Sequence, residues 1–150
     1  MKIIFLDIDG VLNRQDGLNG PDHIDKDMVA NINKIISSTG AKVVITSTWR
    51  CSMSQDQIQD HLNKFGFIGN IIDMTDDNNK SRFNQISDWL DSNTVSDFII
   101  LDDTGVMDHL LHLSSFKKLA NKHFFQTKSL VGLTKDISDK IIDRLNNASK

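Results

Sequence analysis

The feature that most constrains the fold is an apolar run near the N-terminus that ends in two carboxylates. Residues 3–6 are Ile-Ile-Phe-Leu, and Asp7, Ile8, Asp9 and Gly10 follow directly. A short β-rich apolar run predicts a strand that is covered on both faces, as in a parallel sheet. Ligands of such sheets bind beyond the carboxyl ends of the strands, where two crowded acids need a cation, a shared proton or a catalytic task. An Asp-Gly turn is the alternative interpretation of this motif alone.

Composition predicts one globular domain over residues 1–150 and limits its chemistry. The net charge is -3 and the pI is near 5.9, which argues against a strong general affinity for nucleic acid. Cys51 is the only cysteine, so an intramolecular disulfide and a multi-cysteine metal site are excluded. Because the opening apolar run is too short for a signal peptide and no stretch could span a bilayer, we expect a cytoplasmic protein without membrane contact.

The rest of the chain alternates β-rich apolar runs with helical patterns. This alternation predicts right-handed βαβ units and therefore an α/β domain with a parallel sheet. The helices are expected to begin at polar capping residues and to bury one apolar face. Strands are predicted at 3–6, 41–47, 71–74, 97–101 and 123–126, and helices after Asp25, Ser54, Ser81 and Thr134 with a short one at 106–113.

Four groups of polar residues fall at strand ends or helix starts of this predicted sheet. Carboxylates, hydroxyls and cations gathered on one sheet edge suit a phosphate together with a hard cation that prefers oxygen, Mg²⁺ first. Independent caps and turns would have to produce all four groups in this order by chance. The groups are Asp7 with Asp9, Thr46 to Thr48, Lys80 with Arg82, and Asp102 with Asp103.

These segments resemble a known family. IIFLDIDGVLN, VVITSTWR, a basic residue at Lys80 or Arg82, and FIILDD look like motifs one to four of the haloacid dehalogenase (HAD)-like phosphohydrolases. More narrowly, LDIDGVLN, TSTWR, the pattern that begins at Arg82, ILDD and GLT are similar to the small HAD domains associated with RNA-repair proteins. We therefore expect a Rossmann-like three-layer sandwich with a five-stranded, mainly parallel sheet in the order 5-4-1-2-3 and no cap domain.

The resemblance implies a role for each acid. Asp7 would be the nucleophile that forms an aspartyl-phosphate. Asp9 would protonate the leaving oxygen and then deprotonate the hydrolytic water. Mg²⁺ would be held by the Asp7 carboxylate, the backbone carbonyl of Asp9 and Asp102, with Asp103 assisting directly or through water.

The resemblance also implies that a hydroxyl and a cation bind the phosphate. Consecutive strand residues point to opposite faces, so only one or two of the hydroxyls at residues 46–48 can face the phosphate. Ser47 is our first choice, because it follows the apolar run and precedes the loop, and Thr46 is the second. Arg82 fits the narrower family pattern and would contact phosphate with two donors, whereas Lys80 fits the commoner lysine of the wider superfamily.

Two residues that follow the second motif are candidates for substrate contact. Trp49 could stack on a base and Arg50 could bind a second phosphate. The structural alternative is that Trp49 packs beneath the next helix and Arg50 pairs with a surface acid. Both alternatives stay open from the sequence.

The leading functional hypothesis is a Mg²⁺-dependent phosphomonoesterase. The sequence leaves no room for a cap, so the site should be open to a phosphorylated substrate such as a nucleotide or a nucleic-acid end. The alternatives are a phosphatase of small metabolites or phosphoproteins, and a non-catalytic phosphoacceptor or Mg²⁺-binding regulatory module. We expect a monomer or a small homo-oligomer.

Overall fold

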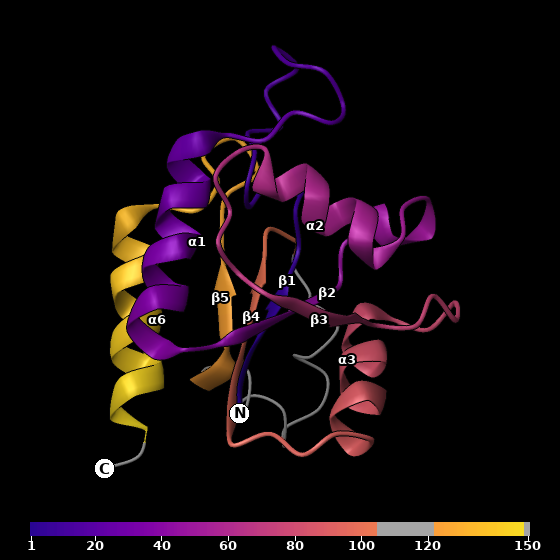
Figure 1. The fold of residues 1–150 in the computed structure, drawn as a ribbon, viewed down its shortest axis with the longest axis vertical. Coiled ribbons are helices and arrows are strands. Elements are labelled where there is room, and N and C mark those ends of the chain that lie inside the picture. The colour runs from indigo at the N-terminus through magenta and orange to yellow at the C-terminus, as the bar shows by residue number, and fades with distance from the viewer. Residues whose placement is uncertain (105–121, 149–150) are drawn as a thin grey trace.

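A five-stranded parallel sheet forms the centre of the molecule, with the strand order β3-β2-β1-β4-β5 (Figure 1). The computed structural model describes residues 1–104 and 122–148. All four strand pairings are parallel, and the order is the predicted 5-4-1-2-3 counted from the other edge. The strands are β1 (Lys2–Leu6), β2 (Lys42–Ile45), β3 (Ile71–Met74), β4 (Asp97–Asp102) and β5 (Phe124–Gln126).

The helices begin where the capping residues predict. Ser54 and Gln57 form a reciprocal capping box, and the hydroxyls of Ser81 and Thr134 accept backbone N–H groups of the first helical turn. Asp25 occupies the first N-cap, but its side chain makes no capping hydrogen bond and pairs with the preceding loop instead. The helices are α1 (Lys26–Thr39), α2 (Gln55–Asn63), α3 (Arg82–Asp91) and α6 (Lys135–Asn147), with a 3₁₀ turn η1 (Thr48–Cys51).

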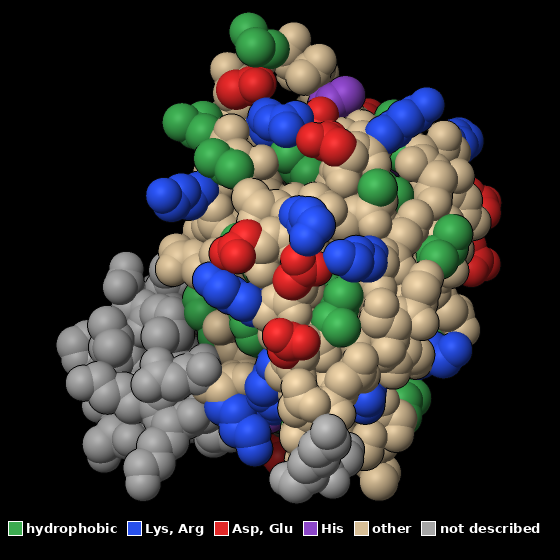
Figure 2. Space-filling view, turned by 90° about the vertical axis from the view of Figure 1, so that its left-hand side faces the viewer, with side chains coloured by type: hydrophobic (Ala, Val, Ile, Leu, Met, Phe, Trp, Pro, Cys, Tyr) green, Lys and Arg blue, Asp and Glu red, His purple; other side chains and the backbone are tan. Residues whose placement is uncertain are grey.

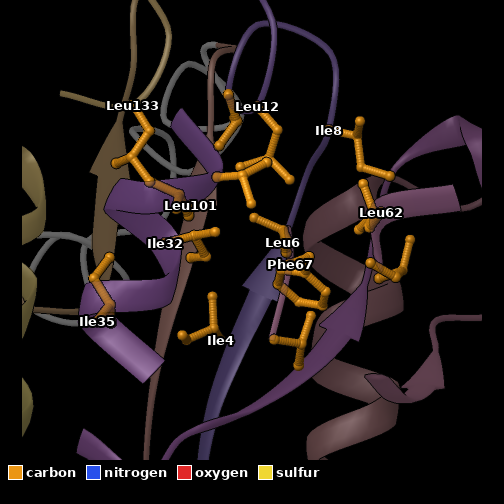
Figure 3. Packing of buried hydrophobic residues seen from close by; sticks show 14 of the residues in the cluster. Ile4, Leu6, Ile8, Leu12, Ile32, Ile35, Leu62, Phe67, Leu101 and Leu133 are labelled. Atoms are coloured by element: carbon orange, nitrogen blue, oxygen red, sulfur yellow. The ribbon is translucent and has the colours of Figure 1, made fainter. Parts of the chain in front are cut away.

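Alternate residues of β1 build two apolar layers, one on each face of the sheet. Ile4 and Leu6 pack into the larger layer, which α1, α2 and α6 cover (Figure 3). Ile3 and Phe5 face the smaller layer beneath α3. All four side chains are fully buried, and burial of each contributes about 1.5–3 kcal/mol. Burial on both faces holds β1 as the central strand.

Several predicted strand boundaries change in the structure, and β1 and β2 each begin one residue away from the predicted start. The second strand was expected to reach residue 47 but ends at Ile45, and the fourth extends one residue further to Asp102. The fifth begins at Phe124 because Lys122 and His123 are helical. The helix predicted at 106–113 lies outside the described residues.

No inserted cap occurs within residues 1–104 and 122–148. A loop joins β1 to α1, and only η1 and α2 separate β2 from β3. In the same residues, no helix is both long enough and apolar enough to cross a membrane. The face over α1 and α6 carries interleaved Lys and Asp side chains (Figure 2), including the ion pairs of Asp139 with Lys34 and Lys135.

Candidate active site

The register of the two central strands places Asp7 beside Asp102. Leu6 of β1 is paired with Leu101 of β4, so the next residue of each strand lies at the same sheet edge. The Asp7 backbone N–H donates to the Leu101 carbonyl at 3.0 Å, which fixes this alignment. Carboxylate oxygens of Asp7, Asp102 and Asp103 lie within 4.8 Å of one another. The structure thus brings together three of the four acids predicted at the strand ends.

Asp103 reaches this cluster because Gly10 has no side chain. Gly10 has a left-handed φ of 76°, and a Cβ placed there would collide with the Asp103 carboxylate. Ser129 donates its hydroxyl to Asp103 Oδ2 at 2.7 Å, and Thr127 donates to the Gly10 carbonyl at 2.7 Å. Sequence reasoning missed Ser129 and Thr127. Their position just after the fifth strand, at the same sheet edge, is the signal that could have found them.

Of the two candidate cations, Arg82 is the one that contacts the acids. Arg82 is the first residue of α3, and its Nη1 donates to Asp102 Oδ2 at 2.6 Å and lies 3.5 Å from Asp7 Oδ2. Lys80 instead pairs with Asp88 at 2.6 Å on the surface. Both cations border one cavity of about 220 Å³. The phosphate-binding role of either cation stays a prediction.

Burial is the main cause of an unusual charge state at Asp7. The residue is only 5% exposed, and burial together with repulsion from Asp102 raises the pKa of Asp7 to about 8. Arg82 acts in the opposite direction but does not cancel this rise. A divalent cation would favour the ionised form, and carboxylate oxygens are the ligands that Mg²⁺ prefers. The donor set of Asp7, Asp102 and Asp103 therefore fits Mg²⁺.

Asp9 has surroundings that differ from those of Asp7. Its Oδ1 accepts a hydrogen bond from Asn13 Nδ2 at 3.0 Å, and its Oδ2 accepts one from Trp49 Nε1 at 3.1 Å. Its carboxylate is not part of the three-acid cluster. Its predicted contribution of a backbone carbonyl to a metal stays a prediction. Two fixed donors, from separate segments of the chain, therefore set the orientation of the Asp9 side chain.

Trp49 and Arg50 both make contacts within the protein. Trp49 is 8% exposed, which leaves little ring surface for stacking on a base. The Arg50 guanidinium donates to the carbonyls of Thr46, Ser47 and Thr75, and it therefore joins the ends of β2 and β3. Its remaining bond reaches Gln85 of α3. Substrate contact by either residue stays a prediction.

Two hydroxyls at the end of β2 are available for a ligand. Thr46 follows Ile45, and its N–H donates to the Leu6 carbonyl, so it lies beside Asp7 on the side opposite Asp102. Thr46 Oγ1 is the only buried side-chain polar atom without a partner in the described residues. Ser47 Oγ accepts the Trp49 N–H at 3.3 Å, so its own hydrogen can still be donated. Which hydroxyl binds phosphate stays a prediction.

Comparison with known protein families gives one match. Residues 3–137 match the family described as the HAD domain in Swiss Army Knife RNA repair proteins. The matched range contains every candidate residue discussed above. No curated protein and no solved structure gives a significant match.

The raised pKa of Asp7 predicts how stability depends on pH in EDTA. Between pH 4 and pH 8 the unfolded chain releases the Asp7 proton and the folded chain retains it, so rising pH favours unfolding. The free energy of unfolding should fall by up to about 1.4 kcal/mol per pH unit from this residue. Urea titrations at several pH values should show this fall in the free energy of unfolding for wild type and not for Asp7→Asn. Parallel pH profiles would contradict the assignment.

The close approach of Gly10 to Asp103 predicts a large effect of Gly10→Ala. Gly40 has a similar φ of 69° with nothing within 4 Å of an added Cβ, so Gly40→Ala measures the backbone strain alone. We expect each variant to lose about 1 kcal/mol from strain and Gly10→Ala to lose a further 1–3 kcal/mol. Urea unfolding measures both, and equal losses would show that Asp103 does not need this space.

Proposed function

This chain belongs to the family of HAD domains found in Swiss Army Knife RNA repair proteins, and we propose that it is a phosphomonoester hydrolase. Its substrate is a nucleotide or a polynucleotide end that carries a phosphate. The observation that supports this most strongly is the in-register pairing that sets Asp7 beside Asp102, with Arg82 bonded to Asp102. The residues that we propose as nucleophile, metal ligands and phosphate-binding cation therefore lie at one sheet edge.

In the first step, an Asp7 carboxylate oxygen attacks phosphorus, and the bond between phosphorus and the leaving oxygen breaks. Asp9 transfers its proton to that oxygen, and an aspartyl-phosphate remains on Asp7. In the second step, Asp9 takes a proton from water, and the water oxygen attacks phosphorus. The bond between phosphorus and the Asp7 oxygen breaks, which releases inorganic phosphate and restores both carboxyl groups.

The charges of the site suit this reaction. Asp7, Asp102 and Asp103 would hold Mg²⁺, which would offset the repulsion between the Asp7 carboxylate and the anionic phosphate. Arg82 can donate to phosphoryl oxygens, because it lies 3.5 Å from Asp7 Oδ2. The unpartnered Thr46 hydroxyl offers a further donor.

The substrate class follows from the family and from access to the site. The family name refers to RNA repair, and the described residues contain no cap that would enclose a small metabolite. A polynucleotide end can itself cover an open site and exclude water. We place this activity in the cytoplasm, in keeping with a single cysteine.

Asp7→Asn tests the nucleophile. It should lower hydrolysis of p-nitrophenyl phosphate with Mg²⁺ by at least about 10³-fold, since an amide neither attacks phosphorus nor binds the cation well. Asp136→Asn, an exposed acid on α6, is the matched control and should retain full activity. The same assay on oligonucleotides with 3′- or 5′-phosphates identifies the substrate. Metal-dependent turnover by Asp7→Asn would exclude the mechanism, and a stable phospho-adduct on wild type would favour a phosphoacceptor.

Trp49→Phe tests whether the indole N–H orients Asp9. We expect kcat to fall roughly tenfold with little change in KM, because Asp9 loses one of two donors. The fall in kcat should be larger for alkyl phosphates than for aryl phosphates, because the leaving oxygen of an aryl phosphate needs less protonation. Trp89→Phe removes a similar indole–Asp bond, to Asp73 on β3, and serves as control. Equal losses for both leaving groups would show that Trp49 only supports the fold.

A further inference from the structure

A cavity of about 340 Å³ opens beside Asp9, on the loop that joins β1 to α1. This loop projects beyond the sheet at the edge where the three acids lie (Figure 1). Asp9 forms part of the cavity wall, whereas Asp7 does not. The remaining wall includes the polar side chains of Asn13, Gln15 and Asn19. The cavity is therefore on the side of the site where the proposed proton donor lies.

The position of the cavity indicates which part of the substrate it could bind, an argument that rests on the proposed function. The group that protonates the leaving oxygen must lie within hydrogen-bond reach of it. The leaving group therefore departs on the Asp9 side. We propose that this cavity binds the leaving group of the substrate, and that the group is an uncharged, hydroxyl-bearing unit of the size of one nucleoside.

The charges around the cavity argue for an uncharged ligand. Arg14 pairs with Asp27 at 2.9 Å and with Asp25 at 3.5 Å. His23 Nε2 lies 2.9 Å from Asp25 Oδ1. Both basic residues of the wall are thus already paired with acids, so the cavity offers a second phosphate little net attraction. The Asn13 amide is already occupied by protein partners. The Asn19 amide can bind hydroxyl and base edges, which both donate and accept hydrogen bonds.

The size of the cavity limits how much of a substrate it can hold. Ligand pockets commonly measure about 300–1,000 Å³, so 340 Å³ is near the lower limit. One sugar or nucleoside fits such a volume, and a longer oligonucleotide does not. On a polynucleotide end, the terminal nucleoside would occupy the cavity and the remaining chain would lie outside.

The part of the cavity wall formed by residues 13–15 is fixed relative to Asp9. Asn13 donates both to Asp9 Oδ1 and to the His23 carbonyl, at 3.0 Å each, so one side chain joins the proton donor to the far end of the loop. The Arg14 N–H donates to Asp25 Oδ2, and the Gln15 N–H donates to the Ser129 carbonyl. A preformed wall reduces the entropy lost when a ligand binds.

Two cavity variants test this proposal by specificity. Asn19→Leu removes a hydrogen-bonding side chain, and Gly20→Phe adds bulk at a residue whose Cβ would meet no atom within 4 Å. Each should lower kcat/KM for adenosine 3′-monophosphate, adenosine 5′-monophosphate or ribose 5-phosphate, relative to p-nitrophenyl phosphate, by at least fivefold. Asn70→Leu, just before β3 at the opposite sheet edge, is the matched control and should leave the ratio unchanged. The three probes distinguish a nucleoside from a simple sugar.

A binding measurement separates this proposal from the proposed function. Adenosine added to ¹⁵N-labelled wild-type protein should shift the amide signals of Gly17, Asn19 and Gly20 more than that of Asn70. Shifts elsewhere, or an unchanged specificity ratio in both cavity variants, would overturn the proposal even if the enzyme hydrolyses phosphomonoesters. Failure to hydrolyse any phosphomonoester, with adenosine still bound in the cavity, would overturn the proposed function alone.

Discussion

The parallel register between β1 and β4 is the constraint on which the site depends. It aligns Leu6 with Leu101 and so places two carboxylates side by side at the exit of the two central strands. Apolar packing on both faces of β1 holds this alignment against the repulsion of the acids. The core therefore maintains an arrangement of charges that would separate if the side chains were free. Burial also makes Asp7 a weak acid. A divalent cation, if bound, would favour its ionised form.

The same short motif gives its two acids different environments. Asp7 directly follows the last residue of β1, and it faces Asp102, Asp103 and Arg82. Asp9 lies two residues later and is anchored by Asn13 and Trp49. Gly10 turns the chain directly after Asp9. Because Gly10 has no side chain, the Asp103 carboxylate can lie against it. The proposed division of labour between nucleophile and proton carrier thus has a structural basis within four residues.

The sequence predicted the elements that depend on local signals. Periodic apolar residues identified the strands, and Ser54, Ser81 and Thr134 marked the helix starts. Parallel topology then brought the acids to one edge. The contacts of Trp49 and Arg50 could not be predicted in the same way, because their partners are distant in the chain and follow no periodic pattern. The side-chain partners of Asn13, Ser129 and Asp25 were not predicted for the same reason: a polar side chain selects its partner only after the backbone has folded.

The most direct test of the central claim is the stereochemical course at phosphorus. A substrate with a phosphate made chiral by oxygen isotopes can be hydrolysed by the wild-type enzyme in the presence of Mg²⁺ and the product analysed. Transfer first to Asp7 and then to water involves two in-line displacements, each of which inverts the configuration. The account predicts net retention. Net inversion would show that water attacks the substrate directly and that Asp7 is not a nucleophile.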